Sequence, residues 1–326
     1  ERPGAGGSVF LADEEVKDFL GACSFVTTPS RDEANRMAGK FGPAPRCEHG
    51  LPEEVVGIDG SLAVVPVDDR LPTSKLAFVT VAAVSLDTRT YLEAAEKPGP
   101  ADPRETNASF SARAFHFMLP GRNMHYKGAE GVRGGFRKAL HEGFHAGRTR
   151  LSDKGGTLAH TLHVLLQSLP KQDGGGKVRV QSCPACGQAS RPIEIEPDPG
   201  QSVCPDCRAD VYDTDVLALD DTGGEDFDVE TAAKRVMNTV EKLIPAHRII
   251  SDVRAGADPY STGFLLDGPL ALFQKPKELT LALGRFHVKA REDARRKGSP
   301  PPVTASLVKT GEIPEHMRAL RPHLRD

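Results

Sequence analysis

The sequence lacks any apolar run long enough to cross a bilayer, and its N-terminus lacks the basic flank and apolar core of a secretion signal. We therefore expect a cytoplasmic protein with no membrane partner. It also lacks a strong charge of one sign, since 42 Lys and Arg against 45 Asp and Glu leave a formal net charge of −3. This balance argues against nonspecific coating of DNA by the whole surface, because phosphate binding draws on clustered Lys and Arg. Any contact with DNA requires a local basic track.

Two stretches supply clustered positive charge. One lies at 285–297 and the other at 133–150. Each fits a track that orients a nucleic-acid backbone, and each fits a solvated helix face equally well. The first comprises Arg285, Lys289, Arg291, Arg295, Arg296 and Lys297, and the second comprises Arg133, Arg137, Lys138, Arg148 and Arg150.

Cysteine is scarce, with six residues in the chain. Four of them form two C-x-x-C pairs separated by seventeen residues, within the spacing typical of a zinc ribbon. Four thiolates fill the tetrahedral shell of zinc, so the predicted site is closed and structural; two disulfides are the disfavoured alternative in a cytoplasmic protein. Cys23 and Cys47, even with the nearby His49, lack further ligands at suitable spacing and are interpreted as ordinary thiols. The predicted zinc ligands are Cys183, Cys186, Cys204 and Cys207.

Two apolar runs stop at an Asp-Gly pair. Residues 55–61 have the sequence VVGIDGS and residues 263–270 have GFLLDGPL, so Asp59 and Asp267 each end a strand-like run on a turn. If the two strands lie side by side in one sheet, their paired carboxylates predict a divalent-metal site. The alternative is a hairpin turn at each pair; Pro269 disfavours it at the second, because proline cannot donate to a returning strand.

An amphipathic helix precedes the second run. Asp226 or Asp228 caps it, and apolar residues at helical spacing over 229–243 predict that one face packs against the sheet. Glu230 and Glu241 lie on the same flank of that face but about 16 Å apart, so only one can join a compact site. For either residue, an exposed helix carboxylate is an equal alternative.

Four short motifs, in this order along the chain, resemble the landmarks of the NurA nuclease family. The resemblance implies that Asp59, Glu230 and Asp267 hold Mn²⁺ or Mg²⁺, with Glu241 as the alternative helix ligand. It also implies that Lys309 holds a phosphate, unless this lysine simply ends a strand. The motifs are Ile58-Asp59-Gly60-Ser61, Phe117-Met118-Leu119-Pro120-Gly121-Arg122-Asn123, Leu266-Asp267-Gly268-Pro269-Leu270 and Ala305-Ser306-Leu307-Val308-Lys309.

The same resemblance implies a fold, an activity and partners. The fold is α/β, an RNase H-like mixed sheet flanked by helices, here with the four-cysteine zinc ribbon inserted. The activity is metal-dependent DNA cleavage, an exonuclease acting at DNA ends, in a homodimer that works with a HerA-type hexameric translocase in DNA repair or defence. The chain departs from the family near its C-terminus, where His316 and His323 are candidates for a further active-site group. Either the chain is a fragment or the site is incomplete.

The predicted zinc ribbon, 173–218, separates two parts of the nuclease domain, 1–172 and 219–326. Strands over 55–67 and 76–86, joined by a hairpin or a longer loop, begin the sheet. Residues 93–107 are predicted as a linker or surface loop. Helices are predicted from Asp13 onward and over 31–37, 136–146, 158–169 and 279–294, with a last strand over 303–308 and a disordered segment at 1–12.

One further motif fits neither the ribbon nor the nuclease. His141, Glu142 and His145 form a literal H-E-x-x-H, which on a helix places two histidines on one face for zinc, with the glutamate as the general base of a peptidase. Two glycines weaken such a helix, and no third ligand follows at a familiar spacing. His160 and His163 are predicted as packing or surface residues. A metallopeptidase, or an inactive zinc-ribbon adaptor that binds DNA or protein, is the alternative to the nuclease.

Overall fold

The computed structural model describes residues 13–23, 29–40, 50–96, 107, 109–172, 176–188, 191–221, 227–272, 276–309 and 311–321. The chain divides into two compact units, one comprising Glu48–Leu307 and the other comprising both chain ends, Glu1–Cys47 and Val308–Asp326. The predicted disordered segment 1–12 and the residues Cys47, His49, Asp226 and His323 lie outside the described part.

Three helices are described in the unit formed by the chain ends. Asp13 caps the first, because its carboxylate accepts the backbone N–H of Glu15 at 2.9 Å, as predicted. Ser30 caps the second in a reciprocal arrangement with Glu33, whose carboxylate accepts the Ser30 N–H at 2.9 Å. The helices are α2 (Glu14–Ala22), α3 (Arg31–Ala38) and α10 (Glu312–Leu320).

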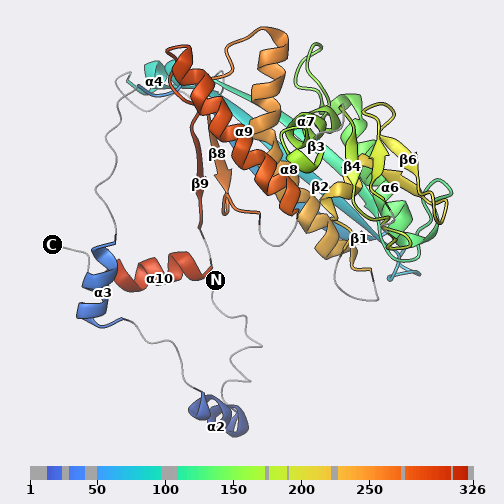
Figure 1. Ribbon diagram of the computed structural model, residues 1–326. Helices are drawn as coiled ribbons and strands as arrows, with labels where there is room; N and C mark the ends of the chain where they lie inside the picture. Colours follow the sequence, from blue (N-terminus) through green and yellow to red (C-terminus); the bar gives the residue numbers. More distant parts are fainter. Residues whose placement is uncertain are drawn as a thin grey trace. The chain divides into compact units, whose positions relative to one another are not determined.

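A five-stranded mixed sheet forms the framework of the larger unit (Figure 1). Its strand order is β3-β2-β1-β8-β9, in which β1, β2 and β3 pair antiparallel, whereas β8 lies parallel to β1 and β9 parallel to β8. The long β1–β2 hairpin confirms the predicted first half of the sheet. The strands are β1 (Glu54–Pro66), β2 (Lys75–Asp87), β3 (Phe110–Pro120), β8 (Thr262–Asp267) and β9 (Thr304–Leu307).

Asp59 lies in the interior of β1. Ile58 is buried, Asp59 is exposed, and the strand continues in register with β2 as far as Pro66. The prediction that Asp59 ends a strand on a turn is therefore wrong, and so is the hairpin alternative, because the chain continues through Ser61 into the apolar residues 62–65, all paired with β2. Asp267, in contrast, ends β8 as predicted, and Gly268 after it takes a φ of +75°, in the left-handed region that favours glycine.

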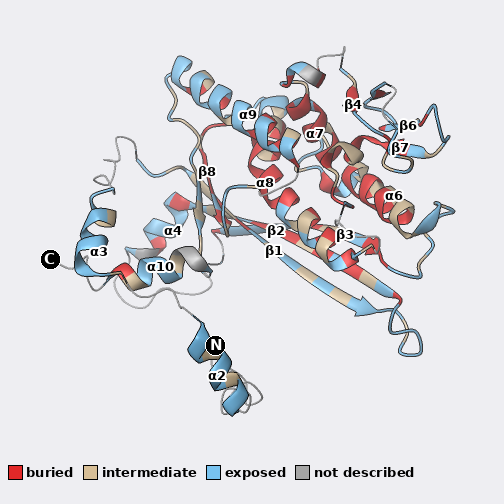
Figure 2. Cartoon of the chain, turned by 60° about the horizontal axis from the view of Figure 1, so that its bottom comes forward, coloured by how far each residue is buried: buried red, intermediate tan, exposed pale blue. Residues whose placement is uncertain are grey.

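Helices cover one face of the sheet, and most of the buried residues lie between the helices and the strands (Figure 2). Helix α8 (Val229–Ala255), capped by Asp228, contacts β1, β2, β3 and β8, while α6 packs on β3 and α7 and α9 pack against α8. On the opposite face, Phe78, Met118 and Leu265 are exposed. None of the described helices combines the length and the apolar character that a membrane span requires. The other elements are α4 (Thr88–Ala95), α6 (Gly131–His145), α7 (Leu158–Leu166), α9 (Lys277–Arg296) and the 3-10 turns η1 (Gly147–Thr149) and η2 (Pro170–Gln172).

A small module lies between α7 and α8 in the sequence. It contains two antiparallel strand pairs and ends in the 3-10 helix η3 (Asp213–Leu217). Its own apolar core packs Ile195 and Val211 around Cys183 and Cys204. The module is thus an insertion with a separate small core, within the same compact unit as the sheet. Its strands are β4 (Val178–Val180), β5 (Ile193–Ile195), β6 (Gln201–Val203) and β7 (Asp210–Tyr212).

Candidate metal centres

The four predicted thiolate ligands converge in the inserted module. The sulfur of Cys183 lies 3.7 Å from that of Cys207, and the sulfur of Cys186 lies 3.9 Å from that of Cys204. All four sulfur atoms lie within 4.8 Å of one another. Two sulfurs bound at about 2.3 Å to a tetrahedral zinc are roughly 3.8 Å apart, so the cluster fits a Zn²⁺ ion that it would hold in a closed shell. We call these four residues the four-cysteine site.

Each C-x-x-C pair is shaped by a tight turn. In the first, the N–H of Gly187 donates to the carbonyl of Cys183 at 2.8 Å, and in the second the N–H of Arg208 donates to the carbonyl of Cys204 at 3.1 Å. Both closing residues adopt positive φ, +70° at Gly187 and +66° at Arg208. Glycine meets this requirement without strain, whereas the arginine adopts a conformation that side chains disfavour.

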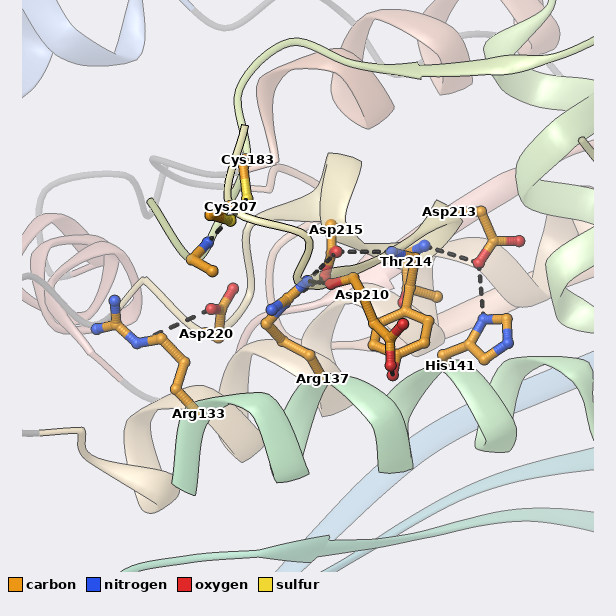
Figure 3. A network of polar contacts seen from close by, with 12 residues as sticks. Arg133, Arg137, His141, Cys183, Cys207, Asp210, Asp213, Thr214, Asp215 and Asp220 are labelled. Atoms are coloured by element: carbon orange, nitrogen blue, oxygen red, sulfur yellow. Dashed lines mark hydrogen bonds and ion pairs between the residues drawn. The ribbon is translucent and has the colours of Figure 1, made fainter. Parts of the chain in front are cut away.

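A second cluster joins the H-E-x-x-H motif to the inserted module (Figure 3). His141 projects from α6 toward Asp213 at the start of η3, with its Nδ1 at 3.1 Å from Oδ1. His145, one turn further along α6, has its Nε2 at 2.7 Å from Oδ2. His163 of α7 also reaches Asp213, its Nε2 lying 2.9 Å from Oδ2. The cluster is therefore built from three separate elements, and we call these four residues the His–Asp cluster.

Asp213 is the ionised centre of this cluster. It is fully buried, and burial alone raises the pKa of its carboxyl group. Hydrogen bonds from His141, His145 and His163 outweigh that effect and hold the pKa well below its ordinary value. The backbone N–H of Thr214 also donates to Oδ1, at 2.8 Å. A carboxylate with this many donors persists as an anion inside the protein.

The glutamate of the motif does not share this site. Glu142 accepts hydrogen bonds from the Tyr126 hydroxyl at 2.7 Å and the Lys127 ammonium at 2.6 Å, and neither residue belongs to the His–Asp cluster. A peptidase of the H-E-x-x-H type needs this carboxylate beside the metal-bound water. Gly143 has a packing role, because an added Cβ would lie 2.7 Å from the ring of Phe117. The geometry thus retains the two histidines of the motif and not its catalytic base.

The two predicted carboxylates of the sheet lie side by side. In the parallel β1–β8 pair, Ile58 faces Leu266, so the next residue on each strand, Asp59 and Asp267, occupies the neighbouring position. Asp59 is exposed and Asp267 is half-buried, with one carboxylate oxygen accepting the Gly268 N–H at 2.9 Å. The side chains of strand neighbours in register project to the same face, which brings the two carboxylates together.

Glu241 of α8 lies at Gly60 on the helix-covered face of the sheet, whereas Asp59 and Asp267 project to the opposite face. An added Cβ on Gly60 would overlap its Oε1, so the bare backbone at Gly60 gives Glu241 its place against β1. Burial raises the pKa of Glu241, the charges of Asp59 and Asp267 raise it further, and Lys242, whose ammonium lies 3.0 Å from Oε2, opposes the shift. We call Asp59, Glu241 and Asp267 the carboxylate site.

Glu230 and Lys309, the other two predicted catalytic residues, have different surroundings. Glu230 is exposed in the first turn of α8, about 16 Å along the helix from Glu241, so the packing of α8 favours Glu241 as the third carboxylate. Glu241 is favoured because Gly60 of β1 has no side chain, which leaves room for the long side chain of Glu241 against the strand. Lys309 is exposed, follows β9 and belongs to the unit of the chain ends, and its role stays a prediction.

One basic stretch is largely committed to internal contacts. Arg137 is buried, donates to Asp215 at 2.8 and 2.5 Å and to the carbonyl of Asp210 at 2.8 Å, and so its assignment to a DNA-binding track is wrong. Arg148 donates to the carbonyl of His116. The stretch on α9 keeps more of its charge at the surface. Its exposed residues include Lys289, Arg291 and Arg295.

Comparison with protein families, with curated proteins and with solved structures finds no match for the chain. The sites therefore rest on geometry alone. The residue that sequence reasoning missed is Asp213, which lies 68 residues after His145 and inside the module assigned to the ribbon. His163 is visible in the sequence as a histidine on an apolar helix, but nothing in its spacing connects it to the motif.

Proposed function

We propose that this chain is a metal-dependent DNA nuclease whose active centre is the carboxylate site. The observation that carries the proposal is the parallel register of β1 and β8, which sets Asp59 beside Asp267 while Glu241 packs on the glycine next to Asp59. Two strand carboxylates in neighbouring positions, with Glu241 near enough for their charges to raise its pKa, are oxygen ligands of the kind that Mg²⁺ and Mn²⁺ prefer. The donors fit such an ion, since all are hard oxygen ligands.

Each residue of the carboxylate site has a separate role in the proposed reaction. When bound, one or two Mn²⁺ or Mg²⁺ ions supply the activated water and the positive charge that phosphodiester cleavage needs. Asp59 and Asp267 present their carboxylates from rigid, paired strands, which limits the reorganisation of the site. Glu241 is held against the sheet by packing, and Lys242 beside it balances part of the negative charge. The exposed cations of α9 would orient the DNA backbone without reading bases.

The proposal includes the family that the motifs resemble. A mixed sheet that begins with three antiparallel strands, carries its first aspartate on the first strand and adds two parallel strands supports an RNase H-like fold. With it we propose NurA-type exonuclease activity at DNA ends, a homodimer, and work with a HerA-type translocase in repair or defence. In this proposal Glu241 replaces Glu230 as the helix ligand, and Lys309 remains the proposed phosphate contact.

The test is nucleotide release from end-labelled linear DNA with added Mn²⁺, with and without a HerA-type translocase. We expect Asp59→Asn, Asp267→Asn and Glu241→Gln each to lower the rate by about 10²-fold or more, because each removes a metal ligand. Glu230→Gln is the matched control: it makes the same chemical change on the same helix and is expected to leave the rate unchanged. All four variants should retain the wild-type melting temperature within a few degrees.

Two outcomes would contradict the proposal. Equal cleavage by wild type and the Asp59 and Asp267 variants would mean that a contaminating nuclease or another site does the chemistry. No cleavage by any protein, with the translocase present, would leave a zinc-ribbon adaptor, which the four-cysteine site independently supports. A loss in Glu230→Gln with full activity in Glu241→Gln would keep the nuclease and reverse the choice of helix ligand.

A further inference from the structure

We propose that the His–Asp cluster is a second zinc site, distinct from the four-cysteine site, and that its Zn²⁺ fastens the inserted module to helices α6 and α7. Its ligands are Nδ1 of His141, Nε2 of His145 and the carboxylate of Asp213, with Nε2 of His163 as the fourth. The ligand atoms of the first three lie within 4.8 Å of one another. This site does not depend on the proposed nuclease activity.

Three donor atoms, one each from His141, His145 and Asp213, already gather around a common point, and His163 Nε2 reaches the same carboxylate from α7. The contacts of the three histidines with Asp213 are 2.7, 2.9 and 3.1 Å, just inside the roughly 3.3 Å that separates two ligand atoms on a tetrahedral zinc. A small outward movement therefore accommodates an ion. The arrangement of His141 and His145 at i and i+4 on one helix is a recurrent way to present two imidazoles to one metal.

Hydrogen bonding alone accounts for the cluster less completely. In that interpretation the imidazoles of His145 and His163 both donate to one oxygen of Asp213, while Thr214 and His141 donate to the other. Burying three imidazoles and a carboxylate together costs free energy of desolvation, and a bound cation would offset that cost.

The surroundings make this a structural site. Gly200 closes the cluster from the ribbon side, since an added Cβ there would overlap His145 Nε2 and lie 2.8 Å from Asp213 Oδ2. Tyr212 stacks on the ring of His141, with ring centroids 4.8 Å apart. Catalytic zinc needs an open coordination position and a general base, and Glu142 is occupied elsewhere. Three nitrogen and oxygen ligands in a largely buried pocket, with His163 beside them as the fourth, suit Zn²⁺, which has no geometric demand beyond a tetrahedron.

The consequence is mechanical. The four-cysteine site holds the inserted module together internally, whereas the His–Asp cluster links the end of that module, η3, to two helices of the main body. An imidazole binds zinc in its neutral form and Asp213 binds as an anion, and because the site forms only in the folded chain, the binding free energy contributes directly to the stability of the joint. Loss of this ion should loosen the module from α6 and α7, where Arg137 still binds Asp215, while the core around the four cysteines stays folded.

The experiment is zinc per chain, measured by plasma mass spectrometry on the full-length protein purified without chelator. We expect two zinc ions in the wild type, one in Cys204→Ser/Cys207→Ser, and one in His145→Ala/His163→Ala. Glu142→Gln is the matched control within the same motif and should retain two. One ion in the wild type and none in the cysteine variant would overturn the proposal, and so would two ions in the histidine variant.

A second measurement covers the case in which the histidine variant fails to fold. The wild-type chain is stripped and reloaded with Co²⁺, one equivalent at a time. A thiolate site gives an intense sulfur-to-cobalt charge-transfer band, whereas a nitrogen and oxygen site adds only weaker visible bands. We expect two equivalents to bind, only one of them producing the charge-transfer band. Saturation after one equivalent, with the thiolate band alone, would overturn the second site.

Discussion

The His–Asp cluster and the carboxylate site differ in closure, although both assemble residues that are far apart in sequence. Among the described residues, only the His–Asp cluster and the four-cysteine site bring three or more ligand atoms within 4.8 Å of one another. Asp213 is fully buried, whereas Asp59 is exposed and Asp267 half-buried. A tight, buried ligand set leaves no position for substrate, and a looser, accessible one does. Closure therefore separates a site that stabilises the fold from one that can turn over.

The difference in closure follows from the secondary-structure elements that carry the ligands, which are helices in one site and mainly strands in the other. The histidines extend from helices packed around the base of the inserted module, and neighbouring rings fix their orientation; the rings of His141 and His145 themselves lie 4.3 Å apart. Asp59 and Asp267 are short side chains on neighbouring strands, and Glu241 packs at Gly60 on the other face of the sheet. The charges of Asp59 and Asp267 raise the pKa of Glu241, so a cation bound among the three carboxylates would relieve their repulsion.

The largest expected difference between the carboxylate site and the two zinc sites is their response to metal removal. A brief exposure to a mild chelator, followed by desalting, is expected to abolish DNA cleavage while both zinc ions stay bound, because open carboxylate sites exchange their ions readily. Added Mn²⁺ should restore the full rate within the mixing time. The measurement is the cleavage rate beside zinc content in the same samples. Parallel loss of zinc and activity, with recovery by Zn²⁺ and not by Mn²⁺, would contradict the distinction.

The next largest effect is expected at the buried ion pair beside the His–Asp cluster. Arg137 binds Asp215 through two hydrogen bonds, and the side chains are 6% and 2% exposed. Arg137→Met strands a buried carboxylate, so we expect a loss of about 3–5 kcal/mol in the free energy of unfolding, measured by urea denaturation.

A neighbouring arginine provides the control for that substitution. Arg133 lies 3.9 Å from Asp220 and is 40% exposed, so Arg133→Met should cost about 1 kcal/mol or less. Similar losses in the free energy of unfolding of the two variants would mean that the contact between the inserted module and α6 does not depend on the Arg137–Asp215 ion pair.

Much of the framework could be predicted from the sequence, because it depends on local patterns. The β1–β2 strands, the cap at Asp228 and the convergence of the four cysteines follow from apolar alternation, capping chemistry and ligand spacing. These signals operate over a few residues or one module. The parallel pairing that places Asp59 beside Asp267 also follows from the sequence, as a hypothesis about which strands are neighbours.

The parts that could not be predicted depend on packing between distant segments. Nothing local tells Glu241 from Glu230, because the choice depends on which turn of α8 meets Gly60. The partner of the H-E-x-x-H histidines is Asp213, in a different module, and no spacing rule spans that distance. Sequence alone places Arg137 in a surface track, because charge does not reveal burial.

His247 is a buried histidine whose described hydrogen-bond partners are not acidic, so we expect its titration to affect the pH dependence of stability. His247 of α8 is fully buried; its Nε2 lies 2.8 Å from the Thr149 carbonyl and its Nδ1 lies 2.7 Å from the Thr161 hydroxyl. Burial lowers the pKa of His247 to about 4. The unfolded chain therefore binds this proton more readily, and the stability contribution present above about pH 6.5 is lost as the pH falls toward 4, by about 2–3 kcal/mol.

The measurement for His247 is the free energy of unfolding at several pH values between about 4 and 7. His247→Gln should have a shallower dependence than the wild type, since it removes the titrating group while keeping a polar side chain. The less buried His125→Gln serves as the control for the substitution itself. An unchanged slope in His247→Gln would mean that other groups account for acid sensitivity.

The smallest expected change in stability, and the sharpest test of the open site, compares two glycines of the same strand. A Cβ at Gly60 would overlap Glu241 Oε1 and lie 2.5 Å from Met237 Cγ, whereas at Gly57 its nearest neighbour would be the Val84 carbonyl at 3.8 Å. Gly60→Ala should cost about 1–2 kcal/mol, because flexible side chains can move, yet slow cleavage strongly by displacing Glu241. Gly57→Ala should leave both the melting temperature and the cleavage rate near the wild type. Full activity in Gly60→Ala would mean that the position of Glu241 against β1 has no part in the chemistry, and the proposed site would reduce to the two aspartates.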